Sequence, residues 1–177
     1  MTGRRKAIQN FLIVLALATL AIQVYARYVP YSLTWVVTPS IPQGLYVSKA
    51  VNGRLLERDE IACFDYPAPA WAQGRGYVPE GMRLCKFVAG VPGDFFSREG
   101  DTLLRAPNGA HPAPIAQFVH VDSKKRPLPQ DAPVLGEVPS GEYVMLAPKY
   151  PNSLDSRYYG RVQARTVTKT LKPIITW

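Results

Sequence analysis

A long apolar segment near the N-terminus constrains this chain more than any other feature of its sequence. Residues 7–26 are largely apolar and carry no charge, and the basic cluster Arg4, Arg5 and Lys6 precedes them. Twenty residues of α-helix rise about 30 Å, roughly the thickness of the hydrocarbon core of a bilayer. Basic residues beside a membrane helix stay on the cytoplasmic side. We therefore expect residues 1–26 to be a membrane anchor and residues 27–177 to lie outside the cytoplasm.

The same segment can also be interpreted as a cleavable signal sequence, because its uninterrupted apolar core, residues 11–22, is short enough for one. An uncleaved anchor is favoured, since Gln23-Val24-Tyr25 is a poor cleavage site. Four aromatic residues that follow the core resemble the belt found at a membrane interface: Tyr25, Tyr28, Tyr31 and Trp35. In either case Cys63 and Cys85 would be exported, where they could form a disulfide or stay as two free buried thiols.

The composition excludes several classes of protein. Two cysteines and two histidines cannot make a disulfide-dense scaffold or a four-cysteine zinc site, and we expect neither a metal nor an organic cofactor. The formal net charge of +8 includes the three basic residues before the anchor. The other basic residues are scattered through loops without interleaved aromatic residues, so we expect no nucleic-acid partner.

Short apolar runs between turn residues predict a mostly β domain. We expect strands at residues 45–51, 61–64, 82–90, 142–147 and 161–170, with Asn52-Gly53 predicting a hairpin after the first. Residues 27–39 are expected to link the membrane to the domain, and residues 65–81 to form a loop. A proline-rich, irregular insert is expected at about 97–140, with a small hairpin near Asn108-Gly109.

Three segments carry polar residues that the strand pattern does not explain. Residues 38–46, T-P-S-I-P-Q-G-L-Y, place Ser40 between two prolines at the start of a strand. In residues 83–94, Lys86 interrupts an apolar strand and shares a face with Leu84 and Val88, where burial would lower its pKa. Residues 148–160 gather hydroxyl groups, a carboxylate and a guanidinium in one turn. Taken singly, each segment also fits a plain structural role: a turn serine, an edge-strand lysine and a polar turn.

In this order, behind an apolar anchor, the three segments resemble the type I signal peptidase family of Ser-Lys proteases. The run Ser40 to Tyr46 is most similar to the TraF branch, the pilin-maturing peptidases of conjugative plasmids. The resemblance implies a coiled β-sheet domain of the LexA and signal peptidase type behind one transmembrane helix. It also implies a bacterial inner-membrane location with the catalytic domain in the periplasm. Two positions depart from the family pattern: Phe87, where many members carry arginine, and Ala147-Pro148, where the last motif usually has Gly-Asp.

The resemblance implies a role for each polar residue of these segments. Ser40 would be the nucleophile and Lys86 the general base, with the Ser153 hydroxyl orienting the neutral lysine. The oxyanion donors would be the backbone N–H of Ser40 and the hydroxyl of Thr38.

Asp155 matches an acidic position to which the TraF branch assigns a catalytic role. A carboxylate very close to Lys86 would raise the pKa of the lysine and oppose its action as a base. We therefore expect Asp155 to act mainly on its loop, through Arg157, unless Asp155 and Lys86 exchange a proton.

The implied function is a membrane-anchored serine endopeptidase that cuts an exported protein precursor at small residues. A conjugative pilin precursor is the expected substrate, and the pilin's own N-terminal amine could capture the acyl-enzyme to give a cyclic product. The alternatives are a general signal peptidase acting on signal-peptide-bearing preproteins, and an inactive scaffold of a secretion apparatus. A LexA-like self-cleaving regulator would need a DNA-binding helix-turn-helix where this chain has its apolar segment.

Overall fold

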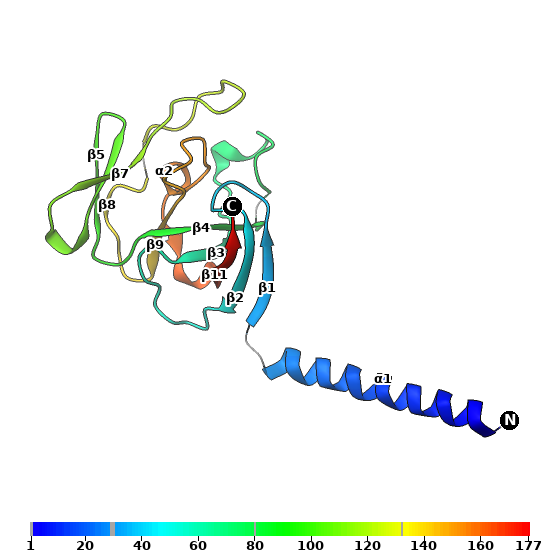
Figure 1. Cartoon of the computed structure of the whole chain (residues 1–177). Coiled ribbons are helices and arrows are strands. Elements are labelled where there is room, and N and C mark those ends of the chain that lie inside the picture. Colours follow the sequence, from blue (N-terminus) through cyan, green and yellow to red (C-terminus); the bar gives the residue numbers. More distant parts are fainter. Residues whose placement is uncertain (1, 29–30, 80, 132) are drawn as a thin grey trace. The chain divides into compact units, whose positions relative to one another are not determined.

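The computed structural model describes residues 2–28, 31–79, 81–131 and 133–177. The chain divides into two units, Met1–Ser32 and Leu33–Trp177. Helix α1 (Thr2–Tyr28) makes up most of the first unit, and the second is rich in strands (Figure 1). This mostly β architecture with one N-terminal apolar helix confirms the predicted fold class.

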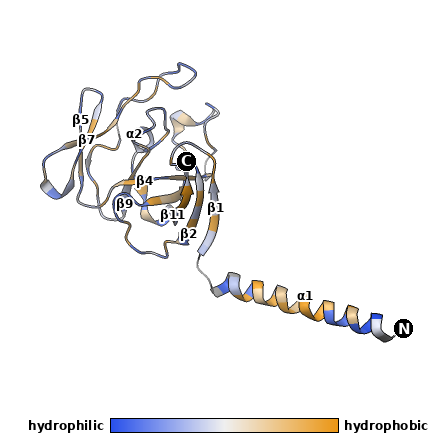
Figure 2. Ribbon diagram, in the orientation of Figure 1, coloured by the Kyte–Doolittle hydropathy of each residue, from blue (hydrophilic) through white to orange (hydrophobic). Residues whose placement is uncertain are grey.

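Helix α1 has the length and composition of a membrane span. Residues 3–25 are apolar enough to cross a bilayer, and their side chains are exposed in the structure. Figure 2 shows the hydrophobic colour along the middle of the helix and the hydrophilic colour near its N-terminal end. These properties suit a membrane anchor or a signal sequence. The side chain of Tyr28, one of the four aromatic residues predicted at an interface, lies outside the described residues.

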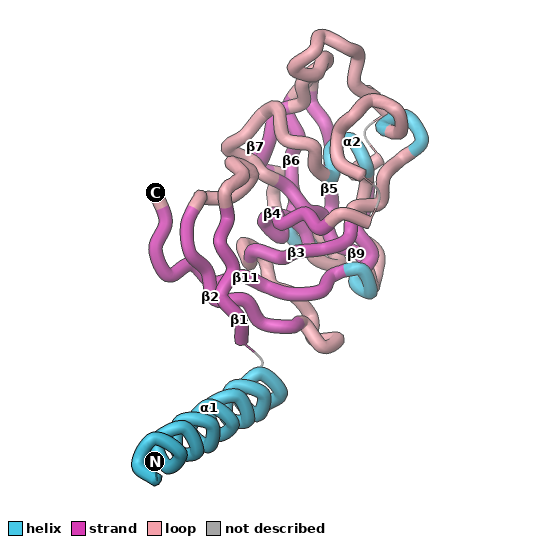
Figure 3. The backbone as a smooth tube through the Cα atoms, turned by 90° about the vertical axis from the view of Figure 1, so that its right-hand side faces the viewer, coloured by secondary structure: helices cyan, strands magenta, loops and turns pink. Residues whose placement is uncertain are grey.

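A seven-stranded sheet forms the main body of the strand-rich part, with the spatial order β1-β2-β11-β3-β4-β9-β10. Its strands are β1 (Tyr31–Val36), β2 (Gly44–Ala50), β3 (Ile61–Asp65), β4 (Arg83–Gly90), β9 (Glu142–Leu146), β10 (Val162–Gln163) and β11 (Val167–Thr176). A second sheet, in the order β7-β6-β5-β8, lies beyond β4 and β9 (Figure 3). Its strands are β5 (Phe95–Glu99), β6 (Thr102–Ala106), β7 (Ala113–Gln117) and β8 (Gly136–Glu137). The short helices are η1 (Ala70–Ala72), η2 (Pro107–Gly109), α2 (Ser156–Tyr159) and η3 (Ala164–Thr166).

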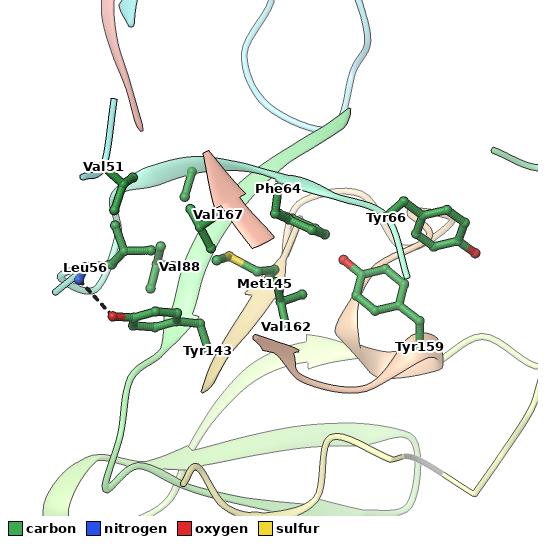
Figure 4. Close-up of a cluster of buried hydrophobic side chains, with 11 residues drawn as sticks. Val51, Leu56, Phe64, Tyr66, Val88, Tyr143, Met145, Tyr159, Val162 and Val167 are labelled. Carbon is green, nitrogen blue, oxygen red and sulfur yellow. Dashed lines mark hydrogen bonds between the residues drawn. The ribbon is translucent and has the colours of Figure 1, made fainter. Parts of the chain in front are cut away.

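One face of the main sheet packs on a cluster of buried side chains contributed by β3, β4, β9 and α2 (Figure 4). Val88 is completely buried in this cluster and Leu84 packs against it. Tyr143 ties the cluster to the loop before β3, because its hydroxyl accepts a hydrogen bond of 3.1 Å from the backbone N–H of Leu56. Strand alternation therefore turns the side chain of Lys86, between Leu84 and Val88, toward the interior.

Two local predictions are wrong. Asn52 and Gly53 do form a turn with positive φ, but no hairpin follows, because β2 pairs with β11 instead of with β3. Residues 161–170 are not one strand. The 3-10 helix η3 interrupts the alternating pattern, so that β10 pairs with β9 while β11 pairs with β2 and β3 and continues to Thr176.

The two segments predicted to be irregular also hold strands. The expected linker, residues 27–39, contains β1, although residues 29–30 lie outside the described residues. The expected insert at about 97–140 contains β6, β7, β8 and most of β5. The small hairpin near Asn108-Gly109 is confirmed, since β6 pairs with β7 on either side of η2. Prolines interrupt the strand periodicity there, yet Phe96, Leu103 and Ala116 bury one face of the small sheet.

Candidate active site

Ser40 lies in a turn between β1 and β2 that is tied to the core on both sides. The next residue, Ile41, is only 1% exposed and packs beside Tyr46, which is completely buried. The Tyr46 hydroxyl donates a hydrogen bond of 2.5 Å to the carbonyl oxygen of Pro42. Ser40 itself is half-buried. Its neighbours are thus fixed while its hydroxyl stays accessible.

The end of the same turn depends on close approach of two backbone segments. The Gln43 side-chain amide donates to the carbonyl oxygen of Val37, which closes the turn around Ser40. Gly44 has φ +149°, and a Cβ there would lie 2.1 Å from the carbonyl oxygen of Ile175 in β11. Only glycine fits this position. Gln43, Gly44 and Tyr46 in the run from Ser40 to Tyr46 therefore each help to hold the turn that carries the serine.

Lys86 is a buried cation at the centre of the site. It lies on β4 opposite Ala62 of β3 and is 3% exposed. Its Nζ is 2.7 Å from Ser40 Oγ and 2.7 Å from Ser153 Oγ. Burial lowers the pKa of the Lys86 ammonium to about 8, against the opposing charge of Asp155 and with a smaller contribution from Arg157 in the same direction as burial. A substantial fraction of Lys86 is therefore neutral near physiological pH, which a general base requires.

The guanidinium of Arg157 donates hydrogen bonds to the backbone of the turn that carries Ser153. Nη2 of Arg157 lies 3.2 Å from the carbonyl oxygen of Tyr150 and 3.4 Å from that of Ser153. The backbone N–H of Ser153 also donates to the Tyr150 carbonyl at 2.9 Å. These bonds hold the backbone of the turn from which the Ser153 hydroxyl contacts Lys86 Nζ.

Asp155 and Arg157 form a fully buried ion pair, with both side chains 0% exposed. Nε and Nη2 of Arg157 each donate to a different oxygen of Asp155 at 2.8 Å. Asp155 also caps α2 by accepting from the backbone N–H of Arg157, and it accepts from the N–H of Ala147. Among the described residues no ion pair joins Asp155 to Lys86. Both carboxylate oxygens of Asp155 thus accept hydrogen bonds from Arg157 and nearby backbone, and none from Lys86 among the described residues.

Ser40, Lys86 and Ser153 open into one cavity of about 480 Å³. Thr38 lines the same cavity, so all the hydroxyl groups singled out from the sequence lie around it. Its apolar wall comes from Val78, Leu84 and Leu154. Such a lining suits an aliphatic side chain beside the reacting groups. Val78 and Tyr150, which also line the cavity, were missed from the sequence because both lie in loops without periodicity.

Cys63 and Cys85 face each other across β3 and β4 and are joined in a disulfide. The bridge lies one residue before Lys86 and closes a loop with a sequence separation of 22. It fixes the two strands next to the lysine. Among the described residues no group of three or more His, Cys, Asp or Glu side chains could hold a metal ion.

Several known proteins are similar to this chain. The family model described as signal peptidase, peptidase S26, matches residues 4–176. Two proteins of Escherichia coli named plasmid transfer protein TraF are similar to this chain. One is 24% identical over 159 residues, which cover 85% of this chain and 80% of the relative. The other is 27% identical over 152 residues, which cover 79% and 81%. A crystal structure of a signal peptidase I from Enterococcus faecalis V583 aligns at 26% identity and a TM-score of 0.39, over 67% of this chain and 98% of that one.

Proposed function

The chain belongs to the peptidase S26 family of signal peptidases, and we propose that it is a membrane-anchored serine endopeptidase in which Ser40 and Lys86 form the catalytic dyad. The observation that carries the proposal is the 2.7 Å separation of Lys86 Nζ from Ser40 Oγ, with the lysine buried and its pKa lowered to about 8. A serine hydroxyl is a weak nucleophile and needs a base within hydrogen-bond reach. Lys86 meets this need without a histidine.

The first chemical step follows from these positions. Neutral Lys86 accepts the proton of the Ser40 hydroxyl as Oγ attacks the scissile carbonyl, and the tetrahedral intermediate carries a negative charge on its oxygen. The backbone N–H of Ser40 and the hydroxyl of Thr38 stabilise this oxyanion in our proposal. Ser153 accepts a hydrogen bond from an N–H of Lys86, which leaves the lysine lone pair directed at Ser40.

Collapse of the intermediate breaks the peptide bond. The Lys86 ammonium gives its proton to the leaving amine, and an acyl-Ser40 ester remains. Neutral Lys86 then activates a water molecule to hydrolyse the ester, or the same ester is captured by an amine of the substrate to give a cyclic product. In both outcomes Asp155 and Arg157 act as positioning residues, because they hold the loop that carries Ser153.

The substrate is, in this proposal, the precursor of a conjugative pilin. Two observations support it: the similarity to relatives that are named for plasmid transfer, and the cavity beside Ser40, whose wall is largely apolar and suits an aliphatic residue at the cleavage site. Residues 1–26 would anchor the enzyme in the inner membrane, with residues 27–177 in the periplasm. The basic residues Arg4, Arg5 and Lys6 support this orientation.

Co-expression with a candidate pilin precursor in a Gram-negative host tests the proposal. The mass of the precursor is followed for the wild type, Ser40→Ala and Lys86→Met, with the exposed Lys124→Met as the matched control. We expect the wild type and the control to shorten the precursor and both dyad variants to leave it intact. A product lighter by one water molecule than the linear fragment identifies cyclisation. Normal processing by folded Lys86→Met would refute the base assignment.

A general signal peptidase and an inactive scaffold give different results in the same host. A signal-peptide-bearing secretory preprotein is expressed in place of the pilin precursor. Cleavage of both by the wild type would identify a general signal peptidase. Failure of folded, membrane-bound wild type to cut either would favour the scaffold.

A further inference from the structure

A second cavity, of about 450 Å³, adjoins the site and is not used by the proposed dyad. Tyr150 lines both cavities, so the two are neighbours. The lining of the second one is mainly apolar and comes from Pro42, Phe87, Ile115, Pro148, Tyr150 and Trp177. A surface of this kind excludes water from an apolar side chain that enters it.

Residues that line the second cavity lie close in sequence to both proposed reacting residues. Pro42 follows Ser40 by two positions, and Phe87 directly follows Lys86. Because successive strand residues point to opposite faces, Lys86 faces the first cavity while Phe87 lines the second. The second cavity is therefore lined by close sequence neighbours of the proposed nucleophile and base.

Positively charged side chains outnumber negatively charged ones in the lining of the second cavity. Arg105, Lys149 and Asp59 line it, which gives two positive groups against one negative. Nη1 of Arg105 donates to the carbonyl oxygen of Ala89 at 2.7 Å, and in the described part of the chain its other nitrogens have no hydrogen-bond or ion-pair partner. Lys149 is exposed. The rim thus favours a substrate segment that carries an acidic group beside its apolar residue.

We propose that this cavity is a second substrate subsite, which binds a large apolar side chain with a neighbouring carboxylate, and that Phe87 determines its specificity. The inference rests on the proposed peptidase function. Phe87 directly follows Lys86 on β4 and contributes an aromatic side chain to the lining of this cavity. An arginine in this position would place a third cation, beside Arg105 and Lys149, against the apolar lining.

Peptide cleavage by the full chain in detergent micelles tests the subsite. The peptides carry small residues at the cleaved bond, and each other position is occupied in turn by leucine or serine. We expect one position, outside the cleaved pair, to favour leucine by about tenfold or more in kcat/KM, mainly through KM, since an apolar pocket discriminates on this scale. An aspartate beside that leucine should lower KM further than an asparagine does, and Lys149→Gln should remove that difference.

Phe87→Arg should bring the ratio of kcat/KM between the leucine and the serine peptide down to about one. Trp177→Ser, at a residue that is 67% exposed, provides a second variant without a buried change. Phe95→Arg is the matched control, because Phe95 is 50% exposed on β5 and lines neither cavity. An unchanged leucine preference in both Phe87→Arg and Trp177→Ser would refute the subsite and leave the peptidase standing. Absence of Ser40-dependent cleavage of every peptide would refute the proposed function, and the subsite with it.

Discussion

Replacement of Lys86 by methionine should stabilise the folded chain at neutral pH, even though it removes the proposed base. Methionine is unbranched and apolar, so it can occupy the space of the lysine stem between Leu84 and Val88. The wild type bears the cost of a cation that is 3% exposed and has no carboxylate in ion-pair contact among the described residues. The variant bears no such cost.

The pKa of Lys86 sets the magnitude. Folding lowers it from 10.5 to about 8, and one pKa unit corresponds to about 1.4 kcal/mol, so the buried charge costs about 3 kcal/mol. Loss of the hydrogen bonds to Ser40 and Ser153 offsets about 1 kcal/mol each. At pH 7 we therefore expect Lys86→Met to raise the free energy of unfolding by about 1 kcal/mol.

The dependence on pH is the sharper part of the prediction. Between about pH 8 and 10.5 the folded chain has lost the Lys86 proton while the unfolded chain still holds it. The unfolded state then binds more protons, so wild-type stability rises with pH over this window, by about 3 kcal/mol in total. Lys86→Met lacks this rise. The sign of the stability difference between the two proteins should therefore reverse above pH 8.

Denaturant unfolding of the full chain in detergent, followed by tryptophan fluorescence from pH 7 to 10.5, measures this difference. The exposed Lys124→Met is the control and should follow the wild type at every pH. A constant difference between wild type and Lys86→Met across the window would show that Lys86 titrates like an ordinary lysine. The reasoning from burial to a neutral base would then fail.

Three further outcomes follow from the same geometry. The kcat/KM of peptide cleavage should rise about tenfold per pH unit below pH 8 and level off above it, as Lys86 loses its proton; a flat profile from pH 6 to 8 would contradict this. Gly44→Ala should displace the Ser40 turn, because its Cβ would lie 2.1 Å from a backbone carbonyl, and lower kcat by about 100-fold; Gly53→Ala, also at a positive φ (+76°) but with open space around it, should keep its activity. Arg157→Met should lower the free energy of unfolding by about 3–5 kcal/mol by leaving Asp155 buried and unpaired, and a loss below 1 kcal/mol in urea unfolding would argue against the ion pair.

Features that depend on local periodicity could be predicted from the sequence. The face that Lys86 shares with Leu84 and Val88 follows from strand alternation alone, and the structure buries all three at least in part. The β2, β3, β4 and β9 segments were identified for the same reason. The mostly β class and the N-terminal helix followed from many short apolar runs and one long one, whereas the signal-peptidase type of sheet was implied by the family resemblance.

Features that depend on distant pairing could not be predicted. The alternation at residues 161–170 continues through η3, and only the separate partners of β10 and β11 reveal that the chain crosses from one side of the sheet to the other. The pairing of β5 with β8 joins Phe96 to Gly136 across a proline-rich segment with little periodicity. Val78 and Tyr150 line the Ser40 cavity from loops, where spacing carries no information about direction.

The position of Asp155 explains how a carboxylate can lie near a lysine that must stay neutral. Its charge raises the pKa of Lys86, but Arg157 lowers that pKa and also takes both carboxylate oxygens in hydrogen bonds of 2.8 Å. The ion pair is neutral as a unit, so burial remains the largest influence on Lys86. Pairing with Arg157 therefore changes what the carboxylate of Asp155 does in the site. An unpaired Asp155 would oppose the base, whereas the paired one holds the turn from which Ser153 reaches Lys86.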